Sequence, residues 1–210
     1  MIDNCNSLVK AGGKMVHVVP IVEGHGEVEA VPVLLRRIAE MTYPRPLLKI
    51  NHPIRVKIGS FLKDDSYFKK QVTLAAAKAA QSGGFVLILL DCEDDCPAIL
   101  GPQILEHARA VRSDVNYVVV LAYREYESWF LAAVPSLRGI YGFPLDLEPP
   151  ADVEAIRDAK GWLGSRMDRK YDVTTHQLEF TSRFDISKAR TNKSFNRCLE
   201  RITTMFGMLI

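Results

Sequence analysis

The sequence predicts an α/β protein built on a parallel sheet. Short apolar runs rich in valine, isoleucine and leucine alternate with segments whose apolar residues recur at helical spacing. The runs carry almost no polar residue, which is typical of strands buried on both faces. Strands and helices that alternate in this way form a parallel sheet with helices packed against it.

The first strand is expected over Met15–Val22, a valine-rich run. A helix is expected over about Glu27–Met41 because its apolar residues are spaced three and four apart. Pro32 fits this helix if it lies in the first turn. A short strand is expected over Ile54–Ile58.

A second helix is expected from the capping residues Asp64–Ser66 to Gln81. The apolar run Phe85–Leu90 follows and predicts a central strand. The remaining core elements are a helix over about Pro97–Ser113, a strand over Tyr117–Ala122 and a helix over Glu125–Val134.

Beyond the proline-rich segment Tyr141–Ala151, the pattern is mostly helical. Helices are expected over about Asp152–Met167, Asp185–Arg190 and Ser194–Phe206. We therefore predict two parts: an α/β core over residues 14–140 and a small helical C-terminal extension over residues 150–210.

Composition excludes few classes of function. The chain has 210 residues, of which 48% are hydrophobic and 25% charged, as in ordinary globular proteins. The net charge of +2 argues neither for nor against a polyanionic partner. No apolar run is long enough for a membrane span and the N-terminus lacks the pattern of a signal peptide, so we expect a cytoplasmic protein without a membrane partner.

Carboxylates follow the central strand directly. Asp91, Glu93 and Asp95 would point the same way if the backbone stayed extended beyond Leu90. Like charges this close raise each other's pKa, and a bound divalent cation makes such a cluster tolerable. Cys92 and Cys96 flank the cluster, but a zinc site would need two more ligands, so we interpret them as free thiols in a reducing compartment.

Two other strand ends also carry paired carboxylates. Glu23 and Glu27 bracket a glycine turn that lacks both the P-loop lysine and the third glycine of a dinucleotide fingerprint. Glu125 and Glu127 follow the strand that ends at Ala122. The alternatives are that Glu27 caps a helix while Glu23 is solvated, and that Glu125 and Glu127 favour the positive end of a helix dipole. His25 is interpreted as a solvated loop residue, with a phosphate contact as the alternative.

The carboxyl ends of parallel strands lie at one edge of a sheet, so these three groups should converge. Carboxylate oxygens suit Mg²⁺ or Mn²⁺. The predicted metal ligands are Glu23, Glu27, Asp91, Glu93, Asp95, Glu125 and Glu127.

The run Val22-Glu23-Gly24-x-x-Glu27, followed by a strand that ends in Asp91-x-Glu93, resembles the Toprim domain. That domain is shared by topoisomerases, bacterial primases, recombination-repair proteins and the overcoming-lysogenization-defect nucleases. Glu93 stands where the family has a second aspartate. The resemblance covers about residues 15–135, and the run from Arg124 to Ala132 is similar to a bacterial Toprim-like family often encoded beside ABC-class ATPases.

The resemblance implies a Toprim-like fold and metal-dependent phosphodiester hydrolysis, with Glu23, Asp91 and Glu93 as catalytic residues. It also implies a nucleic-acid substrate, DNA rather than RNA, and an ABC-class ATPase partner in phage defence. The alternatives are a catalytically silent protein that binds nucleic acid or a partner, and a metal-dependent phosphohydrolase of a small nucleotide. Candidate nucleic-acid contacts, which could equally form a solvated face, are Lys188, Arg190, Lys193 and Arg197.

Overall fold

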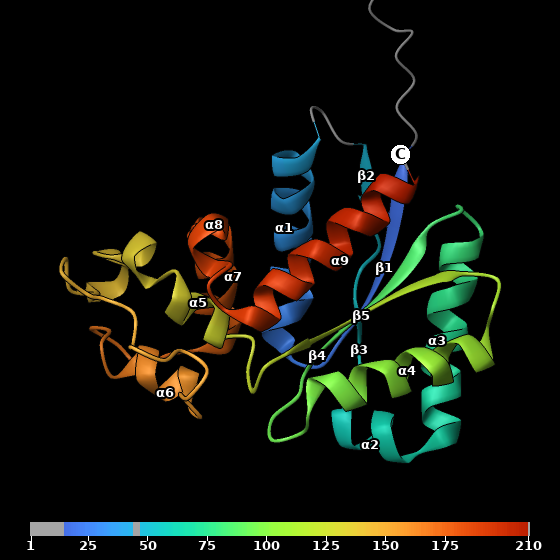
Figure 1. Cartoon of the computed structure of the whole chain (residues 1–210), viewed down its shortest axis with the longest axis horizontal. Helices are drawn as coiled ribbons and strands as arrows, with labels where there is room; N and C mark the ends of the chain where they lie inside the picture. Colours follow the sequence, from blue (N-terminus) through green and yellow to red (C-terminus); the bar gives the residue numbers. More distant parts are fainter. Residues whose placement is uncertain (1–14, 44–46, 210) are drawn as a thin grey trace, which may run out of the picture.

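A parallel sheet lies at the centre of the computed structural model, which describes residues 15–43 and 47–209 (Figure 1). The strand order is β2-β1-β4-β5, and β3 pairs with the carboxyl-terminal part of β1. The strands are β1 (Val16–Val22), β2 (Leu48–Ile50), β3 (Ile54–Arg55), β4 (Phe85–Asp91) and β5 (Asn116–Ala122). Every pairing is parallel. The predicted α/β class is therefore confirmed.

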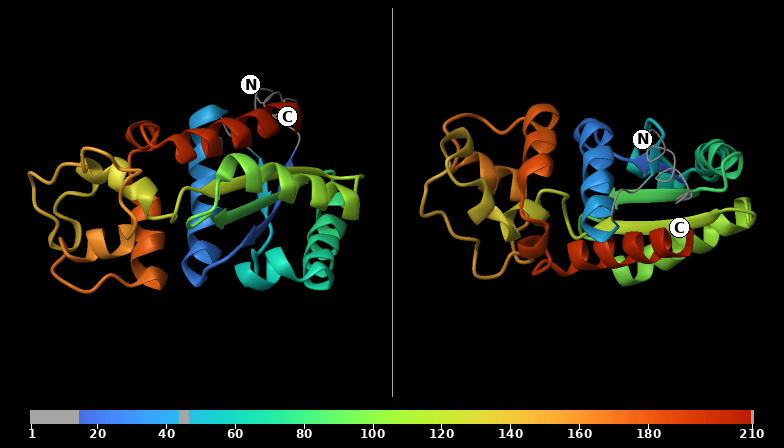
Figure 2. Two further views of the ribbon diagram at one scale, coloured as in Figure 1. Left: turned by 60° about the horizontal axis from the view of Figure 1, so that its bottom comes forward. Right: turned by 90° about the horizontal axis from the view of Figure 1, so that it is seen from above.

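Helices cover both faces of the sheet, as Figure 2 shows for α3 and α9. One face packs on α2 (Ile58–Lys63), α3 (Asp65–Ala80) and α4 (Pro97–Val111), and the other on α1 (His25–Thr42) and α9 (Lys193–Leu209). Successive strand residues alternate between the faces, so Leu87 packs with α1 and α9 while Ile88 packs with α3. Uninterrupted apolar strands are the consequence.

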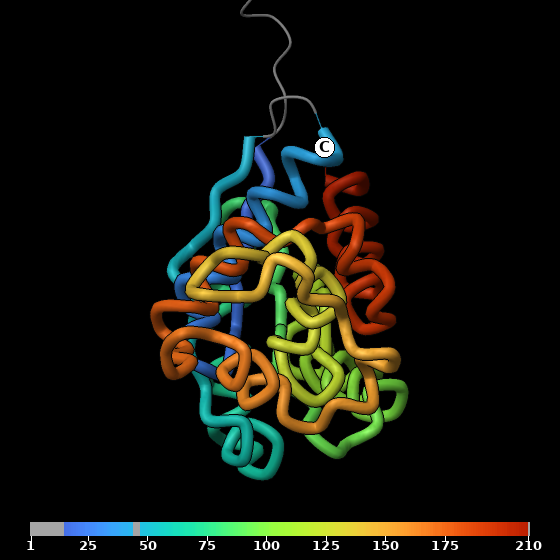
Figure 3. The backbone as a smooth tube through the Cα atoms, turned by 90° about the vertical axis from the view of Figure 1, so that its left-hand side faces the viewer, coloured from blue at the N-terminus to red at the C-terminus, as the bar shows by residue number. Residues whose placement is uncertain are grey.

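The C-terminal extension is helical, as predicted, and its part before α9 forms a lobe beyond the carboxyl ends of the strands (Figure 3). It contains α6 (Ala159–Gly164), α7 (Val173–Arg183) and α8 (Ile186–Ala189), packed beside α5 (Ser128–Ala132) and the 3₁₀ turns Val134–Leu137 and Ile140–Gly142. The boundary near residues 140–150 stays a prediction. The buried cluster on the α1 face of the sheet nevertheless draws on both sides of it, from Leu87 to Phe180 and Phe206.

Some predicted elements are wrong in extent. α1 begins at His25, so Pro32 lies beyond the first turn; burial of Val31, Leu34 and Leu35 holds the helix together despite the missing N–H. The expected strand over Ile54–Ile58 has two residues because Ile58 begins α2.

Two predicted helices are shorter than expected, and two helices, α2 and α7, were missed. The helix expected over Glu125–Val134 spans Ser128–Ala132, because Arg124 has a left-handed φ of 64° and the chain turns through the next residues. The helix expected over Asp152–Met167 shrinks to α6, which the Asp158 side chain caps. α7 has a mostly polar sequence and β-branched residues at its start, so it left little periodic signal.

Among the described residues, no helix has both the length and the apolar character that a bilayer span requires.

Candidate functional site

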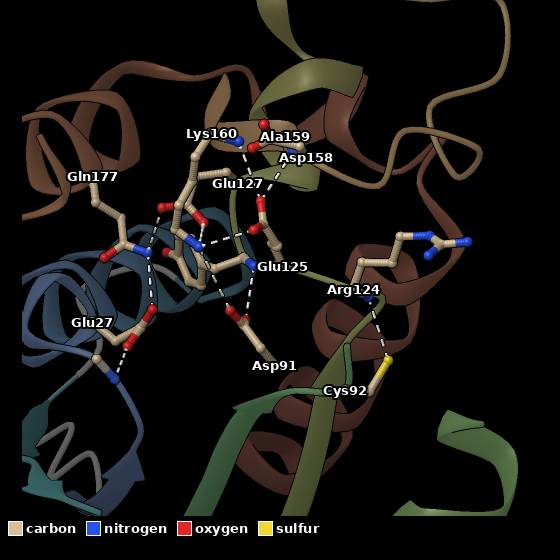
Figure 4. Close-up of polar contacts among 12 residues, drawn as sticks. Glu27, Asp91, Cys92, Arg124, Glu125, Glu127, Asp158, Ala159, Lys160 and Gln177 are labelled. Carbon is tan, nitrogen blue, oxygen red and sulfur yellow. Dashed lines mark hydrogen bonds and ion pairs between the residues drawn. The ribbon is translucent and has the colours of Figure 1, made fainter. Parts of the chain in front are cut away.

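The carboxyl ends of β1, β4 and β5 meet at one edge of the sheet and bring acidic residues together (Figure 4). Val22 pairs with Leu89 and Asp91 pairs with Ala122, so the segments that follow the three strands start at the same level. The expected convergence of strand ends is therefore present in the structure.

The two glycines after β1 allow Glu27 to reach the site. Glu27 Oε2 accepts a hydrogen bond from the Gly24 amide, and Glu27 Oε1 accepts one from Gln177 Nε2 at 3.0 Å. A Cβ atom on Gly24 would overlap the Glu27 carboxylate, and one on Gly26 would overlap Gln177. Glu27 thus caps α1, as the alternative interpretation held, but its buried carboxylate also faces the site.

Asp91 ends β4 with its carboxylate turned into the site. Its Oδ1 accepts a hydrogen bond of 2.8 Å from the Tyr126 amide, which ties β4 to the segment after β5. Burial, followed by the charges of Glu127, Glu27 and Glu23, raises the pKa of Asp91 well above its usual range, against the lowering effect of Lys160.

Glu127 is the most enclosed of these carboxylates, with a side chain that is 0% exposed. Its Oε1 accepts hydrogen bonds from the Tyr171 hydroxyl at 3.0 Å and from Gln177 Nε2 at 3.4 Å. Its Oε2 lies 3.1 Å from Lys160 Nζ, an ion-pair contact without hydrogen-bond geometry. Burial raises the pKa of Glu127, and Lys160 opposes that rise.

Lys160, the second residue of α6, places its ammonium between the carboxylates. Its Nζ lies 3.4 Å from Glu125 Oε1 and 4.0 Å from Asp91 Oδ2. Burial lowers the pKa of Lys160, but the surrounding carboxylates outweigh burial, so the net pKa is raised and the side chain stays charged. Glu125 also holds α6 in place, because its Oε2 accepts from the Ala159 and Lys160 amides at 3.0 and 3.2 Å.

Glu23 lies half-buried beside this network. Burial, then the charges of Glu27 and Glu93, raises its pKa to about 7, while Lys160 and a backbone hydrogen bond from Asp91 lower it. Glu23 Oε2 is buried and accepts no hydrogen bond, and the same holds for Gln177 Oε1. The site therefore contains more acceptor oxygens than its donors satisfy.

Glu93 and Asp95 lie outside this network. The backbone does not stay extended after β4, because Glu93 has a left-handed φ of 46° and the Asp95 amide closes a turn onto the Cys92 carbonyl at 2.8 Å. The expected alternation of Asp91, Glu93 and Asp95 is therefore wrong beyond β4. Both side chains are exposed, although the charge of Glu93 still reaches Glu23.

The predicted nucleic-acid contacts Lys188, Arg190, Lys193 and Arg197 are all exposed. Lys193 pairs with Glu154 at 3.1 Å, and Arg190 Nε donates to Asn196 at 2.9 Å. Their exposure fits both a solvated face and a phosphate-binding role. Cys92 is buried and Cys96 exposed, and both are free thiols.

Sequence reasoning missed Lys160, Tyr171 and Gln177. All three come from the C-terminal extension and complete the site from the side opposite the strands. Asp158 and Asp172, which cap α6 and α7, were the available local signals for these helices. Neither cap indicates that the helices face the strand ends. Over residues 15–43 and 47–209, no group of three or more His, Cys, Asp or Glu side chains is spaced to hold a metal ion.

A family model described as "Domain of unknown function (DUF4276)" matches residues 22–203, from the end of β1 into α9. It spans every element that contributes to the site. No curated protein and no solved structure matches the chain. Because the model covers most of the sequence, the chain belongs to the DUF4276 family.

Proposed function

We propose that the protein is a divalent-metal-dependent nuclease whose site is the carboxyl edge of the sheet. One observation carries the proposal. Two of the buried side-chain atoms without a hydrogen-bond partner are carboxylate oxygens of this site: Glu23 Oε2 and Glu127 Oε2, the second of which has only the ion-pair contact with Lys160 Nζ. Buried acceptors without donors are costly, and a cation beyond Lys160 would satisfy them.

The donor set fits a hard cation. Glu23, Glu27, Asp91 and Glu127 would hold Mg²⁺ or Mn²⁺, since such ions prefer carboxylate oxygens. Glu93 stays a candidate ligand on the neighbouring loop. A bound cation would supply Lewis-acid stabilisation of the charge on a phosphodiester. Within the described part of the chain no three carboxylates are spaced as ligands, so binding requires them to draw together and Lys160 to yield its place.

The protein's own residues would transfer a proton and hold the carboxylates of the site in place. Glu23, with a pKa of about 7, is suited to take or give a proton near neutral pH. Lys160 would oppose protonation of Asp91 and Glu127 while no metal is bound. Gln177 and Tyr171 would hold the carboxylates of Glu27 and Glu127 in place through their hydrogen bonds.

The biological setting rests on the sequence motifs alone. The resemblance of the segments around Glu23 and Asp91 to the Toprim domain supports DNA as the substrate, and the narrower resemblance supports an ABC-class ATPase partner in phage defence. The same resemblance supports assigning catalytic roles to Glu23, Asp91 and Glu93.

A catalytically silent protein that binds nucleic acid or a partner is the second candidate. The placement of Lys160 favours it, because the ammonium already neutralises part of the site and the described residues form no group spaced as metal ligands. Such a protein would bind without cutting.

Cleavage of single-stranded DNA, duplex DNA and RNA by the chelator-treated full chain, with Mg²⁺ or Mn²⁺ added back, tests the proposal. We expect metal-dependent cleavage that Asp91→Asn abolishes and that Asp146→Asn, at an exposed position, leaves unchanged. Binding without cleavage under all metal conditions would favour the silent protein. Cleavage that survives Asp91→Asn would remove this site from the mechanism.

A further inference from the structure

A groove lies between α4 and α9, along the edge of the sheet that β5 forms. β5 pairs with β4 on one side, and α4 and α9 flank it on the other. Two cavities of about 370 and 230 Å³ follow one another along β5 and share Pro102 and Arg201 as lining residues. The groove therefore extends from the amino-terminal half of β5 to its carboxyl end, where the acidic site begins.

One wall of the groove is basic. Lys193, Arg197 and Arg201 lie four residues apart on α9, so they share a face and rise by about 6 Å from one to the next. Arg197 and Arg201 line the groove over Val120 and Leu121. This separation is comparable with that of successive phosphates in an extended nucleic-acid strand.

The cations of the groove are only partly neutralised. Arg201 donates to the Val119 carbonyl, a neutral group, and Arg197 is exposed. Among the described residues, no carboxylate forms a salt bridge with either arginine. Lys193 does have an acidic partner, Glu154. Glu200 also lines the groove, and its carboxylate accepts a hydrogen bond from Asn196 Nδ2 at 2.8 Å. Arg197 and Arg201 are thus left for an external anion.

Polar contacts continue from the groove to the carboxylates. Lys193 binds Glu154, and Arg124 Nε donates to the Glu154 carbonyl at 3.4 Å. Arg124 also pairs with Asp94 at 3.1 Å, and Arg157 pairs with the same carboxylate. Arg124 lies two residues before Tyr126, whose amide holds Asp91 at 2.8 Å. These contacts join the wall of the groove to the segment that holds Asp91.

We propose that this groove is the path of a single nucleic-acid strand, whose phosphates bind Arg197 and Arg201 and whose reactive phosphodiester then reaches the acidic site. The inference rests on the proposed nuclease function for its ligand class. The other end of the groove is apolar, with Leu105, Met205 and Met208 among its lining residues. Unpaired bases expose apolar faces that such a surface can contact, whereas the bases of a duplex are stacked inside.

Binding in the presence of chelator tests the path without cleavage. Fluorescence anisotropy of the full chain would use fluorescein-labelled oligonucleotides of mixed sequence: single-stranded DNA, single-stranded RNA and duplex DNA. We expect both single strands to bind more tightly than the duplex, and the ratio of DNA to RNA affinity identifies the preferred sugar. Arg197→Glu should weaken single-strand binding about tenfold at low salt, and Arg197→Ala should reduce the slope of log Kd against log salt concentration by about 0.7. The matched control is Arg36→Glu at an exposed position of α1, which should bind as the parent does.

The outcomes separate the groove from the nuclease. If Arg197→Glu loses binding and the parent does not cleave, the groove binds nucleic acid but the nuclease proposal is wrong. If the parent cleaves and Arg197→Glu binds as the parent does, the nuclease proposal stands but the groove is not the path. Absence of binding to any oligonucleotide, or a preference for the duplex, overturns the groove. Asp91→Asn should bind a single strand at least as well as the parent, because it removes a negative charge without touching the groove.

Discussion

The two sides of the acidic site have opposite chemistry. The strand ends supply carboxylates, from Glu23 to Glu127, whereas α6, α7 and the segment between them supply donors: Lys160, Tyr171 and Gln177. Carboxylates alone would repel one another in a buried place. The extension therefore completes the site electrostatically, and the sheet and the extension depend on each other for stability.

The positive and negative charges of the two sides do not balance. One ammonium faces several carboxylates, and the pKa values of Glu23, Asp91 and Glu127 are all raised. The donors of the extension hold the site together without neutralising it fully. Bound protons, or the cation that we propose, would supply the rest.

Removing the ammonium of Lys160 should have the largest effect on stability. Lys160→Met should lower the free energy of unfolding by about 3 kcal/mol, because Glu127 is left buried without a counter-charge. Urea unfolding in chelator measures the change. The control is Lys170→Met, at an exposed position between α6 and α7, which should be as stable as the parent. Equal stability of both variants would mean that Lys160 does not offset the carboxylates.

Removing a neutral donor should have a smaller effect. Gln177→Leu leaves the acceptor oxygens of Glu27 and Glu127 with one donor fewer, at a cost of about 2 kcal/mol in unfolding free energy. Gln103→Leu, on an exposed position of α4, provides the comparison. The same urea experiment would contradict a bridging role for Gln177 if both leucine variants unfolded alike.

Titration of Glu23 tests the same imbalance of charge, and we expect it to have the smallest effect on stability of the three changes. Its pKa rises from 4.5 to about 7 on folding, so between these values the folded protein holds a proton that the unfolded chain has released. Stability should therefore fall as pH rises through this window and level off above it. In chelator, Glu23→Gln should show a shallower fall than the parent, while Glu29→Gln, exposed on α1, should follow the parent. Parallel curves for the parent and Glu23→Gln would mean that Glu23 titrates normally.

The sheet and the strand-end carboxylates were predictable because buried parallel strands are apolar runs and their carboxyl ends share one edge. Phe85–Asp91 is such a strand, with six apolar residues before Asp91. α3 was predictable from its capping residue Asp64. The loop after β4 was not predictable, since nothing in the residue type of Glu93 announces a left-handed backbone.

Lys160 and Gln177 were not predictable for a different reason. Their positions depend on packing between distant segments: Gly26 on α1 leaves room for Gln177 on α7, and Glu125 holds the start of α6. Contacts of this kind leave no periodic trace in either segment, and the mostly polar sequence of α7 hid the helix itself.

The most direct test of the central claim, that the strand-end carboxylates form a cation site, is thermal unfolding of the parent and Asp91→Asn with chelator and with Mn²⁺. In chelator, Asp91→Asn should melt at the same temperature as the parent or higher, because the amide keeps the Tyr126 hydrogen bond and removes repulsion from Glu127 and Glu27. Added Mn²⁺ should raise the Tm of the parent and raise that of the variant less, as ligand linkage requires. An Asp91→Asn protein stabilised by Mn²⁺ as much as the parent, or a parent that Mn²⁺ does not stabilise, would contradict the account.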